Sequence, residues 1–170
     1  MDTSLPLSVV ILAAGKGTRM KSASAKVLHE VFYRPMLHYV LDSVVPLEPE
    51  NTIAVIGHQK EAVIHILDSF EVTCCEQLEQ NGTGHAVICA RDLLEGADGS
   101  LLVLYGDVPL LRPATLLELK ERHELRGNGV TVLTARLPDP SGYGRVFRDA
   151  DGGFLRIVED RDLAEEERSI

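Results

Sequence analysis

Along most of the chain, short apolar runs alternate with stretches whose apolar residues recur at helical spacing. The run Val9-Val-Ile-Leu-Ala-Ala14 is continuous and rich in β-branched residues, as expected of a strand that is buried on both faces. This alternation predicts βαβ crossovers and a mostly parallel sheet with helices on both faces, in three α/β/α layers. The predicted strands cover residues 8–14, 52–57, 71–76, 100–105 and 130–137, and the predicted helices cover 35–45, 59–69, 84–95 and 114–126.

The pattern changes after Leu137. Pro138, Pro140 and several glycines interrupt short apolar segments at 144–149 and 154–159, which predicts a small antiparallel excursion. The chain shows no internal repeat, low-complexity tract or linker. We therefore expect residues 1–170 to belong to one domain.

Composition restricts the class of protein. The chain has 170 residues, of which 45% are apolar and 25% charged, so it can bury a sizeable core. No apolar stretch approaches the ~20 residues that span a bilayer, and the first residues lack the basic start and apolar centre of a signal peptide. We expect a cytoplasmic protein without membrane contact, in which the three cysteines are reduced thiols; these are Cys74, Cys75 and Cys89.

The formal net charge of −9 argues against general binding of nucleic acid, because phosphate backbones attract a basic surface. The local balance is different between Gly15 and Arg34, where five cations accompany one acid, Glu30. The cations are Lys16, Arg19, Lys21, Lys26 and Arg34. A small positive region in an acidic molecule suits a small phosphorylated ligand, although it is also what a solvated surface segment would show.

The first apolar run ends in a loop with two glycines, Leu12-Ala-Ala-Gly-Lys-Gly-Thr-Arg-Met20. Glycines at 15 and 17 lack the Cβ atoms that would keep a phosphate away from the backbone N–H groups, and Lys16 and Arg19 supply mobile positive charge. The loop can therefore wrap an anion, and we interpret it as a nucleoside-triphosphate site. Taken alone, a short Gly-x-Gly segment is also compatible with a turn that binds no ligand.

Two familiar glycine signatures do not fit this loop. In a P-loop, a glycine is followed after four residues by Gly-Lys-Ser/Thr, but Gly15-Lys16 is followed by Gly17 and preceded at the required spacing by Val10. A dinucleotide fingerprint needs a third glycine where Met20 stands. A P-loop nucleotidase and a hydride-transfer enzyme are therefore disfavoured.

Other catalytic signatures are missing as well. His58 and His65 are seven residues apart and no His-Glu-x-x-His occurs, so no zinc site is expected. No Gly-x-Ser-x-Gly segment supplies a nucleophile for acyl transfer.

Asp107 follows the predicted strand Ser100-Leu-Leu-Val-Leu-Tyr105 and the turn residue Gly106. In open parallel sheets, ligands bind beyond the carboxyl ends of the strands, which is where Asp107 and the glycine loop would both lie. A carboxylate in this place suits Mg²⁺, which prefers oxygen ligands and is often held by one or two carboxylates together with substrate phosphates. The alternative is an aspartate that caps the turn into the helix near Pro113.

Five motifs in one order resemble the sugar nucleotidyltransferases, and most of all the uridyltransferase domains of bacterial bifunctional uridyltransferase/acetyltransferases. The motifs are Leu-x-x-Gly-x-Gly-Thr-Arg-Met with Lys26 and Pro35 downstream, Glu79-Gln-Asn-Gly-Thr-Gly-His-Ala86, Leu104-Tyr-Gly-Asp-Val-Pro-Leu110, Gly142-Tyr-Gly-Arg145 and Ile157-Val-Glu-Asp160. The resemblance extends over nearly the whole chain. It implies a Rossmann-like nucleotide-diphospho-sugar transferase fold.

The resemblance implies a magnesium-dependent reaction of UTP with N-acetyl-α-D-glucosamine 1-phosphate, which gives UDP-N-acetylglucosamine, a cell-envelope precursor, and diphosphate. Arg19 and Lys26 would be the catalytic residues, and Asp107 would hold Mg²⁺. The implied substrate-binding positions are Leu12, Ala13, Ala14, Gly15, Lys16, Gly17, Lys26, Gln77, Gly82, Thr83, Tyr105, Gly106, Asp107, Gly144 and Glu159.

Individual residue types suit the implied roles. Uracil offers two acceptors and one donor, which Gln77, Thr83 and a backbone group at Gly82 can pair with. Thr83 could instead, or in addition, cap the helix that is predicted to start near Gly84. Glu159 can accept hydrogen bonds from sugar hydroxyls, or be an exposed charge at a strand end.

The chain departs from the family pattern after Glu159. The later asparagines that contact the sugar and complete the magnesium site, and the β-helix that carries the acetyltransferase, have no counterpart in it. We expect an incomplete nucleotidyltransferase domain that binds UTP weakly and turns over poorly alone. Two alternatives stay open: a nucleotidyltransferase of the hexose-phosphate or molybdopterin type, and a non-catalytic nucleotide-sugar-binding domain. The sequence does not indicate the number of subunits.

Overall fold

The computed structural model describes residues 5–17, 22 and 24–170, and the chain divides into two compact units, Met1–Gly129 and Val130–Ile170. The sequence-based prediction that residues 1–170 work as one nucleotidyltransferase domain stays a prediction.

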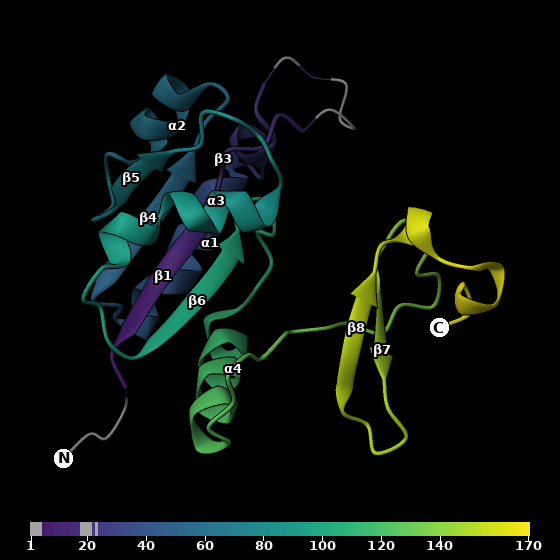
Figure 1. The fold of residues 1–170 in the computed structure, drawn as a ribbon. Helices are drawn as coiled ribbons and strands as arrows, with labels where there is room; N and C mark the ends of the chain where they lie inside the picture. The colour runs from purple at the N-terminus through teal and green to yellow at the C-terminus, as the bar shows by residue number, and fades with distance from the viewer. Residues whose placement is uncertain (1–4, 18–21, 23) are drawn as a thin grey trace. The chain divides into compact units, whose positions relative to one another are not determined.

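The first unit is built on a four-stranded parallel sheet (Figure 1). Its strands lie in the order β5-β4-β1-β6. They are β1 (Leu7–Leu12), β4 (Asn51–Ile56), β5 (Thr73–Glu76) and β6 (Ser100–Tyr105). The register places Leu12 beside both Val55 and Tyr105, so β1, β4 and β6 end at nearly the same level. Four of the five predicted parallel strands are therefore confirmed.

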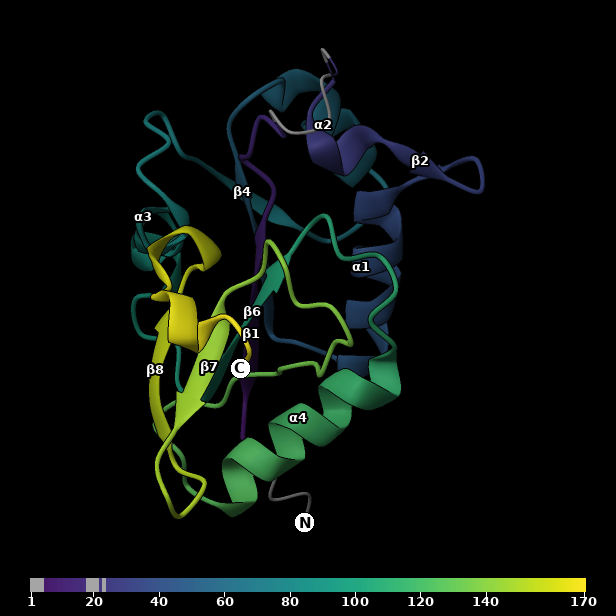
Figure 2. The ribbon, with the colours of Figure 1, turned by 90° about the vertical axis from the view of Figure 1, so that its right-hand side faces the viewer.

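The sheet has helices on both faces (Figure 2), as predicted. The helices are α1 (Met36–Val44), α2 (Lys60–Leu67), α3 (Thr83–Cys89) and α4 (Pro113–Leu125). Successive residues of β1 pack on opposite faces of the sheet. Val9 and Ile11 pack with α1, α2 and Leu116 of α4, whereas Val10 packs on the other face with Ala86 of α3. All three β1 side chains are fully buried, which explains the continuous apolar run.

Short elements join these layers. They are the 3-10 helices η2 (Lys26–Leu28), η3 (Val45–Leu47) and η4 (Arg91–Leu94), and the two-residue strands β2 (Glu30–Val31) and β3 (Arg34–Pro35). Phe32 and Tyr33 form the turn between β2 and β3, and both have positive φ angles, 47° and 64°. The predicted helix 84–95 is divided at Ala90, after which i→i+3 hydrogen bonds replace the α-helical pattern.

The second unit contains an antiparallel ribbon of β7 (Arg145–Arg148) and β8 (Phe154–Val158), followed by η5 (Asp160–Asp162) and η6 (Glu165–Glu167). This confirms the predicted antiparallel excursion. The predicted strand at 130–137 is wrong, because these residues form no strand and Val130, Val132 and Leu133 are exposed. An alternating apolar pattern becomes a strand only where a neighbouring strand pairs with it.

Within the described part of the chain, no helix has the length and apolar character needed to cross a membrane.

Candidate functional site

A cavity of about 510 Å³ opens at the carboxyl ends of β1 and β6, a size typical of small-molecule sites. It gathers residues from four parts of the sequence: the glycine loop after β1, the start of η2, the segment before α3, and the turn after β6. The lining residues are Leu12, Ala14, Gly15, Gly17, Lys26, Val27, Gln77, Gln80, Gly82, Thr83, Ala86, Tyr105 and Asp107. Ten of the predicted binding positions therefore lie around one cavity.

Lys26 lies directly against the glycine loop. Gly17 has φ +64°, and a Cβ atom at this position would lie 2.8 Å from the Cβ of Lys26. The loop therefore needs glycine at 17 both for its left-handed backbone and for the close approach of Lys26. Arg19, the other predicted catalytic residue, lies outside the residues that the structure describes.

Asp107 forms an ion pair with Lys26, with 2.5 Å between its Oδ2 and the Nζ of the lysine. Gly106 holds this corner of the cavity, because its N–H donates to the carbonyl of Leu12 at 3.0 Å. A Cβ at Gly106 would lie 3.0 Å from Val27 Cγ1 and 3.1 Å from the Leu12 oxygen. The proposed capping role of Asp107 is wrong, because Arg112 is the N-cap residue of α4.

On the opposite wall, Gln77 directs its side-chain amide into the loop before α3. The backbone N–H of Gln77 donates to Ile56 and extends the pairing of β4 and β5, and its side chain is 6% exposed. Its Nε2 donates to the carbonyl of Gly82 at 3.1 Å and lies 3.1 Å from Nδ1 of His85. The amide is therefore held in one orientation relative to the cavity.

The same loop shows how α3 begins. Gly82 is the N-cap residue, with φ +94° and ψ 177°, a conformation that is essentially restricted to glycine. Thr83 is the first helical residue, so the alternative in which Thr83 caps the helix is wrong.

The ion pair between Lys60 and Glu76 joins α2 to the end of β5, and the hydrogen bond to Glu76 raises the pKa of Lys60.

Three predicted positions of the first unit do not line the cavity. Ala13 is buried and its N–H donates to Val55 at 2.8 Å, so its side chain belongs to the core. Gly106 is buried beneath the cavity, and Lys16 is an exposed residue of the loop. A ligand could still meet their backbone groups, so their predicted roles as contacts stay predictions.

The sequence-based prediction missed several residues at the site. Val27, Gln80 and Ala86 line the cavity. Gly57 lies beneath it, because a Cβ there would be 3.0 Å from the Cβ of Ala14 and 3.2 Å from the carbonyl of Gln77. Gln80 and Ala86 lie inside the motif that contains Gly82 and Thr83, which is the one signal that could have found them.

In the second unit, the two predicted sugar-binding residues lie at the same end of the ribbon. Gly144 precedes β7 and Glu159 follows β8, and Arg145 is paired with Val158. A Cβ at Gly144 would lie 3.9 Å from the Cα of Glu159. The strand pairing therefore brings these two residues together.

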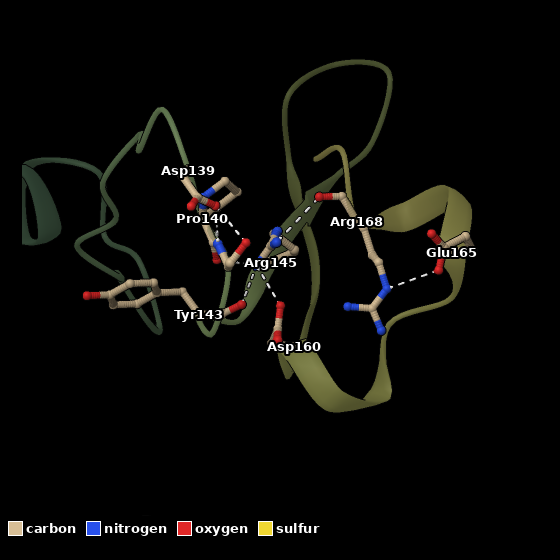
Figure 3. A network of polar contacts seen from close by, with 8 residues as sticks. Asp139, Pro140, Tyr143, Arg145, Asp160, Glu165 and Arg168 are labelled. Atoms are coloured by element: carbon tan, nitrogen blue, oxygen red, sulfur yellow. Dashed lines mark hydrogen bonds and ion pairs between the residues drawn. The ribbon is translucent and has the colours of Figure 1, made fainter. Parts of the chain in front are cut away.

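Arg145 fixes this end of the ribbon (Figure 3). Its side chain is 5% exposed, and its guanidinium donates to the carbonyls of Pro140 at 2.8 Å, Tyr143, and Arg168 at 3.4 Å. Its Nη1 also lies 3.5 Å from Oδ1 of Asp160. The bonds of Nη1 and Nη2 offset part of the cost of burying this charge, whereas its buried Nε has no hydrogen-bond partner. In the preceding turn, a hydrogen bond from the hydroxyl of Ser141 lowers the pKa of Asp139, and the Ser141 N–H adds to the effect.

The thiols lie away from the cavity lining. All three cysteines are free, and Cys74 and Cys75 pack on opposite faces of the sheet. Burial raises the pKa of Cys75 to about 11, and the neighbouring Cys89 and Cys74 thiols contribute.

The chain belongs to the MobA-like NTP transferase domain family, which matches residues 9–150. This assigns it to the nucleotidyltransferase class, in agreement with the three-layer fold. Two solved structures share the fold: a nucleotidyl transferase from Methanothermobacter thermautotroptrophicus and CTP:phosphocholine cytidylyltransferase from Streptococcus pneumoniae. The first has a TM-score of 0.59 at 23% identity over 68% of this chain and 57% of its own. The second has a TM-score of 0.64 at 16% identity over 92% of this chain and 65% of its own.

Among curated proteins, the chain is similar to bifunctional protein GlmU from many bacteria. It is 48% identical to the Thermobifida fusca protein over 100% of this chain and 36% of that protein. It is 50% identical to the protein of Synechococcus sp. (strain CC9902) over 95% of this chain and 36% of that protein. The chain therefore spans about a third of the length of these relatives.

Proposed function

We propose that this chain is a uridylyltransferase domain that joins UTP to N-acetyl-α-D-glucosamine 1-phosphate and releases diphosphate. The observation that carries the proposal is the single cavity that gathers the glycine loop, Lys26 and Asp107 with Gln77, Gly82 and Thr83. Its cationic and backbone N–H groups suit a triphosphate, and its amide-rich wall suits a pyrimidine. The similarity to bifunctional protein GlmU supports this choice of substrates.

Base selection would rest on Gln77. Its Nε2 donates to the carbonyl of Gly82, so Oε1 is the amide atom that would accept the N3–H of uracil. Cytosine has a bare acceptor at N3, which would face the same Oε1 without a proton between them. A cavity of this kind would prefer UTP to CTP.

In the reaction, the sugar phosphate oxygen would attack the α-phosphorus, and diphosphate would leave in line. Catalysis would depend on positioning and on stabilisation of charge at the phosphoryl oxygens rather than on a protein nucleophile. Lys26 and the backbone N–H groups of Gly15–Gly17 would hold phosphate oxygens, and Arg19 would contribute a second cation. Gly144 and Glu159 would bind the sugar.

Asp107 is the residue that would hold Mg²⁺. The described residues contain no group of three or more metal-ligating side chains, but Mg²⁺ in nucleotide enzymes commonly uses one or two carboxylates with phosphate oxygens and water. Asp107 is half-buried at the cavity wall and already binds a cation, so the donor chemistry fits. When bound, the ion would neutralise charge on the phosphates.

Two experiments test the proposal. Calorimetric titrations with UTP, CTP, dTTP and GTP should show weak binding with preference for UTP, and a diphosphate-release assay with the sugar phosphate should show slow Mg²⁺-dependent turnover that Asp107→Asn removes. Preference for another nucleotide would favour a transferase with another acceptor. UTP binding without turnover in a version extended at the carboxyl end would favour a non-catalytic nucleotide-sugar-binding domain. Absence of binding to every nucleotide would contradict the proposal. The predicted cytoplasmic location stays a prediction.

A further inference from the structure

Two glutamine side chains from distant parts of the sequence bind the backbone before and after Gly15–Gly17. Before these residues, the carbonyl of Ala14 accepts a hydrogen bond from Nε2 of Gln80 at 2.9 Å. After them, directly before η2, the N–H of Ala25 donates to Oε1 of Gln59 at 2.6 Å. Ala14 and Ala25 are both buried, whereas Gln59 and Gln80 are exposed residues, so each bond joins a surface side chain to a buried stretch of backbone.

Gln59 has an unusual backbone conformation. It is the N-cap residue of α2 and has φ +56° and ψ 41°, in the left-handed region that disfavours residues other than glycine and asparagine. Its own carbonyl accepts from the N–H groups of Ala62 and Val63 and so begins the helix. Its side chain, which is absent from the cavity lining, extends to Ala25 instead.

Gln59 binds the backbone next to Lys26, the residue that is expected to contact the phosphates. Ala25 immediately precedes Lys26, whose Nζ lies 2.5 Å from Asp107. Ala25 is fully buried and Val27 is 3% exposed, so the backbone on both sides of Lys26 is fixed while its side chain points to the cavity.

We propose that Gln59 is a positioning residue: as a hydrogen-bond acceptor for Ala25, it fixes the backbone directly before Lys26 and thereby the place of Lys26 in the nucleotide site. Gln80 is the corresponding donor at the start of the loop. The part that concerns the backbone of Ala25 stands on the structure alone, and the part that concerns nucleotide binding rests on the proposed function.

If Gln59 acts as a hydrogen-bond acceptor, its variants should differ in the rate of amide exchange at Ala25, in an order that a purely structural role would not give. Gln59→Glu keeps an acceptor oxygen at the same reach, Gln59→Met keeps the length without an acceptor, and Gln59→Gly removes the side chain while suiting the left-handed backbone. Amide hydrogen exchange at Ala25 should be slow in the wild type and in Gln59→Glu. It should be at least about tenfold faster in Gln59→Met and Gln59→Gly. The Val63 amide, held by the backbone of residue 59, is the internal control and should change little.

Nucleotide affinity is the second measurement. UTP should bind about five- to tenfold more weakly to Gln59→Met than to the wild type, because Lys26 is less well placed. At high salt, which screens the added charge, Gln59→Glu should bind UTP better than Gln59→Met.

The outcomes separate this inference from the proposed function. Unchanged exchange at Ala25 in both Gln59→Met and Gln59→Gly would overturn the positioning role. Faster exchange with unchanged UTP affinity would overturn the link to Lys26. If the wild type binds no UTP at all, the proposed function fails, and the exchange measurement still decides the role of Gln59.

Discussion

Nζ of Lys26 lies 2.5 Å from Oδ2 of Asp107, although the two residues come from the beginning of η2 and from the turn after β6. Both side chains line the same cavity and are partly exposed. A carboxylate that is paired with an ammonium group is less available to a metal ion. Nucleotide phosphates would offer Lys26 another partner and so free Asp107, which predicts that nucleotide and metal bind cooperatively.

Replacement of Lys26 should therefore separate metal binding from nucleotide binding. In Lys26→Met, Mn²⁺ added without nucleotide should bind about fivefold more tightly than in the wild type. A partly exposed ion pair of this kind is worth up to about 1 kcal/mol, which corresponds to about that factor. UTP should bind more weakly to the same variant, because a phosphate contact is lost. Electron paramagnetic resonance of free Mn²⁺ and calorimetry with UTP measure the two effects.

Lys120→Met, which removes a lysine paired with Glu124 within α4, is the matched control and should change neither affinity. Weaker Mn²⁺ binding to Lys26→Met in the absence of nucleotide would contradict the competition described above.

Gly106→Ala should destabilise the protein by about 1–3 kcal/mol, the usual cost of forcing an extra methyl group into a packed site. The new Cβ would be 3.0 Å from Val27 Cγ1, 3.1 Å from the carbonyl of Leu12 and 3.3 Å from Leu37 Cδ1. Gly84→Ala is the control, since no atom beyond the chain neighbours and the backbone of its own helix lies within 4 Å of the added Cβ, and alanine favours the helix. Urea unfolding of both variants tests this, and equal midpoints would refute it.

The turn between β2 and β3 should become more stable when its strain is removed. Tyr33 has φ +64° and is 93% exposed, so it contributes little packing to offset a left-handed backbone that costs roughly 1–2 kcal/mol. Tyr33→Gly should raise the unfolding free energy by up to about 1 kcal/mol, part of the gain being lost to the greater chain entropy of glycine. Tyr33→Ala removes the same ring but keeps the strain, so a stabilisation as large as that of Tyr33→Gly would contradict this explanation.

Cys75 should react slowly with iodoacetamide at pH 8. Burial and the neighbouring thiols raise its pKa from 9.0 to about 11, so at this pH its thiolate fraction is lower by about a hundredfold than that of a thiol with the ordinary value. Mass spectrometry of peptides after timed alkylation measures the rate, with the urea-unfolded chain as reference. Similar rates in the folded and unfolded chain would disagree with the burial of Cys75.

The fold was predictable where apolar runs are continuous. The strand at 100–105 is found as predicted, because a run such as Leu101–Tyr105 between a charged segment and a glycine has few alternatives. The prediction of a strand at 130–137 was wrong, because strand formation depends on a pairing partner that local sequence does not report. The predicted helix 84–95 was too long, because hydrogen bonding changes to the i→i+3 pattern at Ala90.

The candidate site was predictable as far as its motifs reach. Gly17, Lys26, Gln77 and Asp107 were singled out from sequence, and they line one cavity. Gln59 could not be found in this way, because its contact with Ala25 joins residues 34 positions apart and depends on how α2 packs. The role of Gly57 is equally hidden, since it arises from the close approach of Ala14 and the backbone of Gln77.

The central claim is that the cavity between the glycine loop and Asp107 holds the triphosphate of UTP, and NMR titration of the ¹⁵N-labelled chain with UTP tests it most directly. The account predicts that UTP shifts the amide resonances of Gly15, Gly17, Gly82 and Asp107, while those of Gly96 and Gly127, which do not line the cavity, stay in place. Shifts that cluster at residues outside the cavity, with the four cavity amides unchanged at saturating UTP, would contradict it.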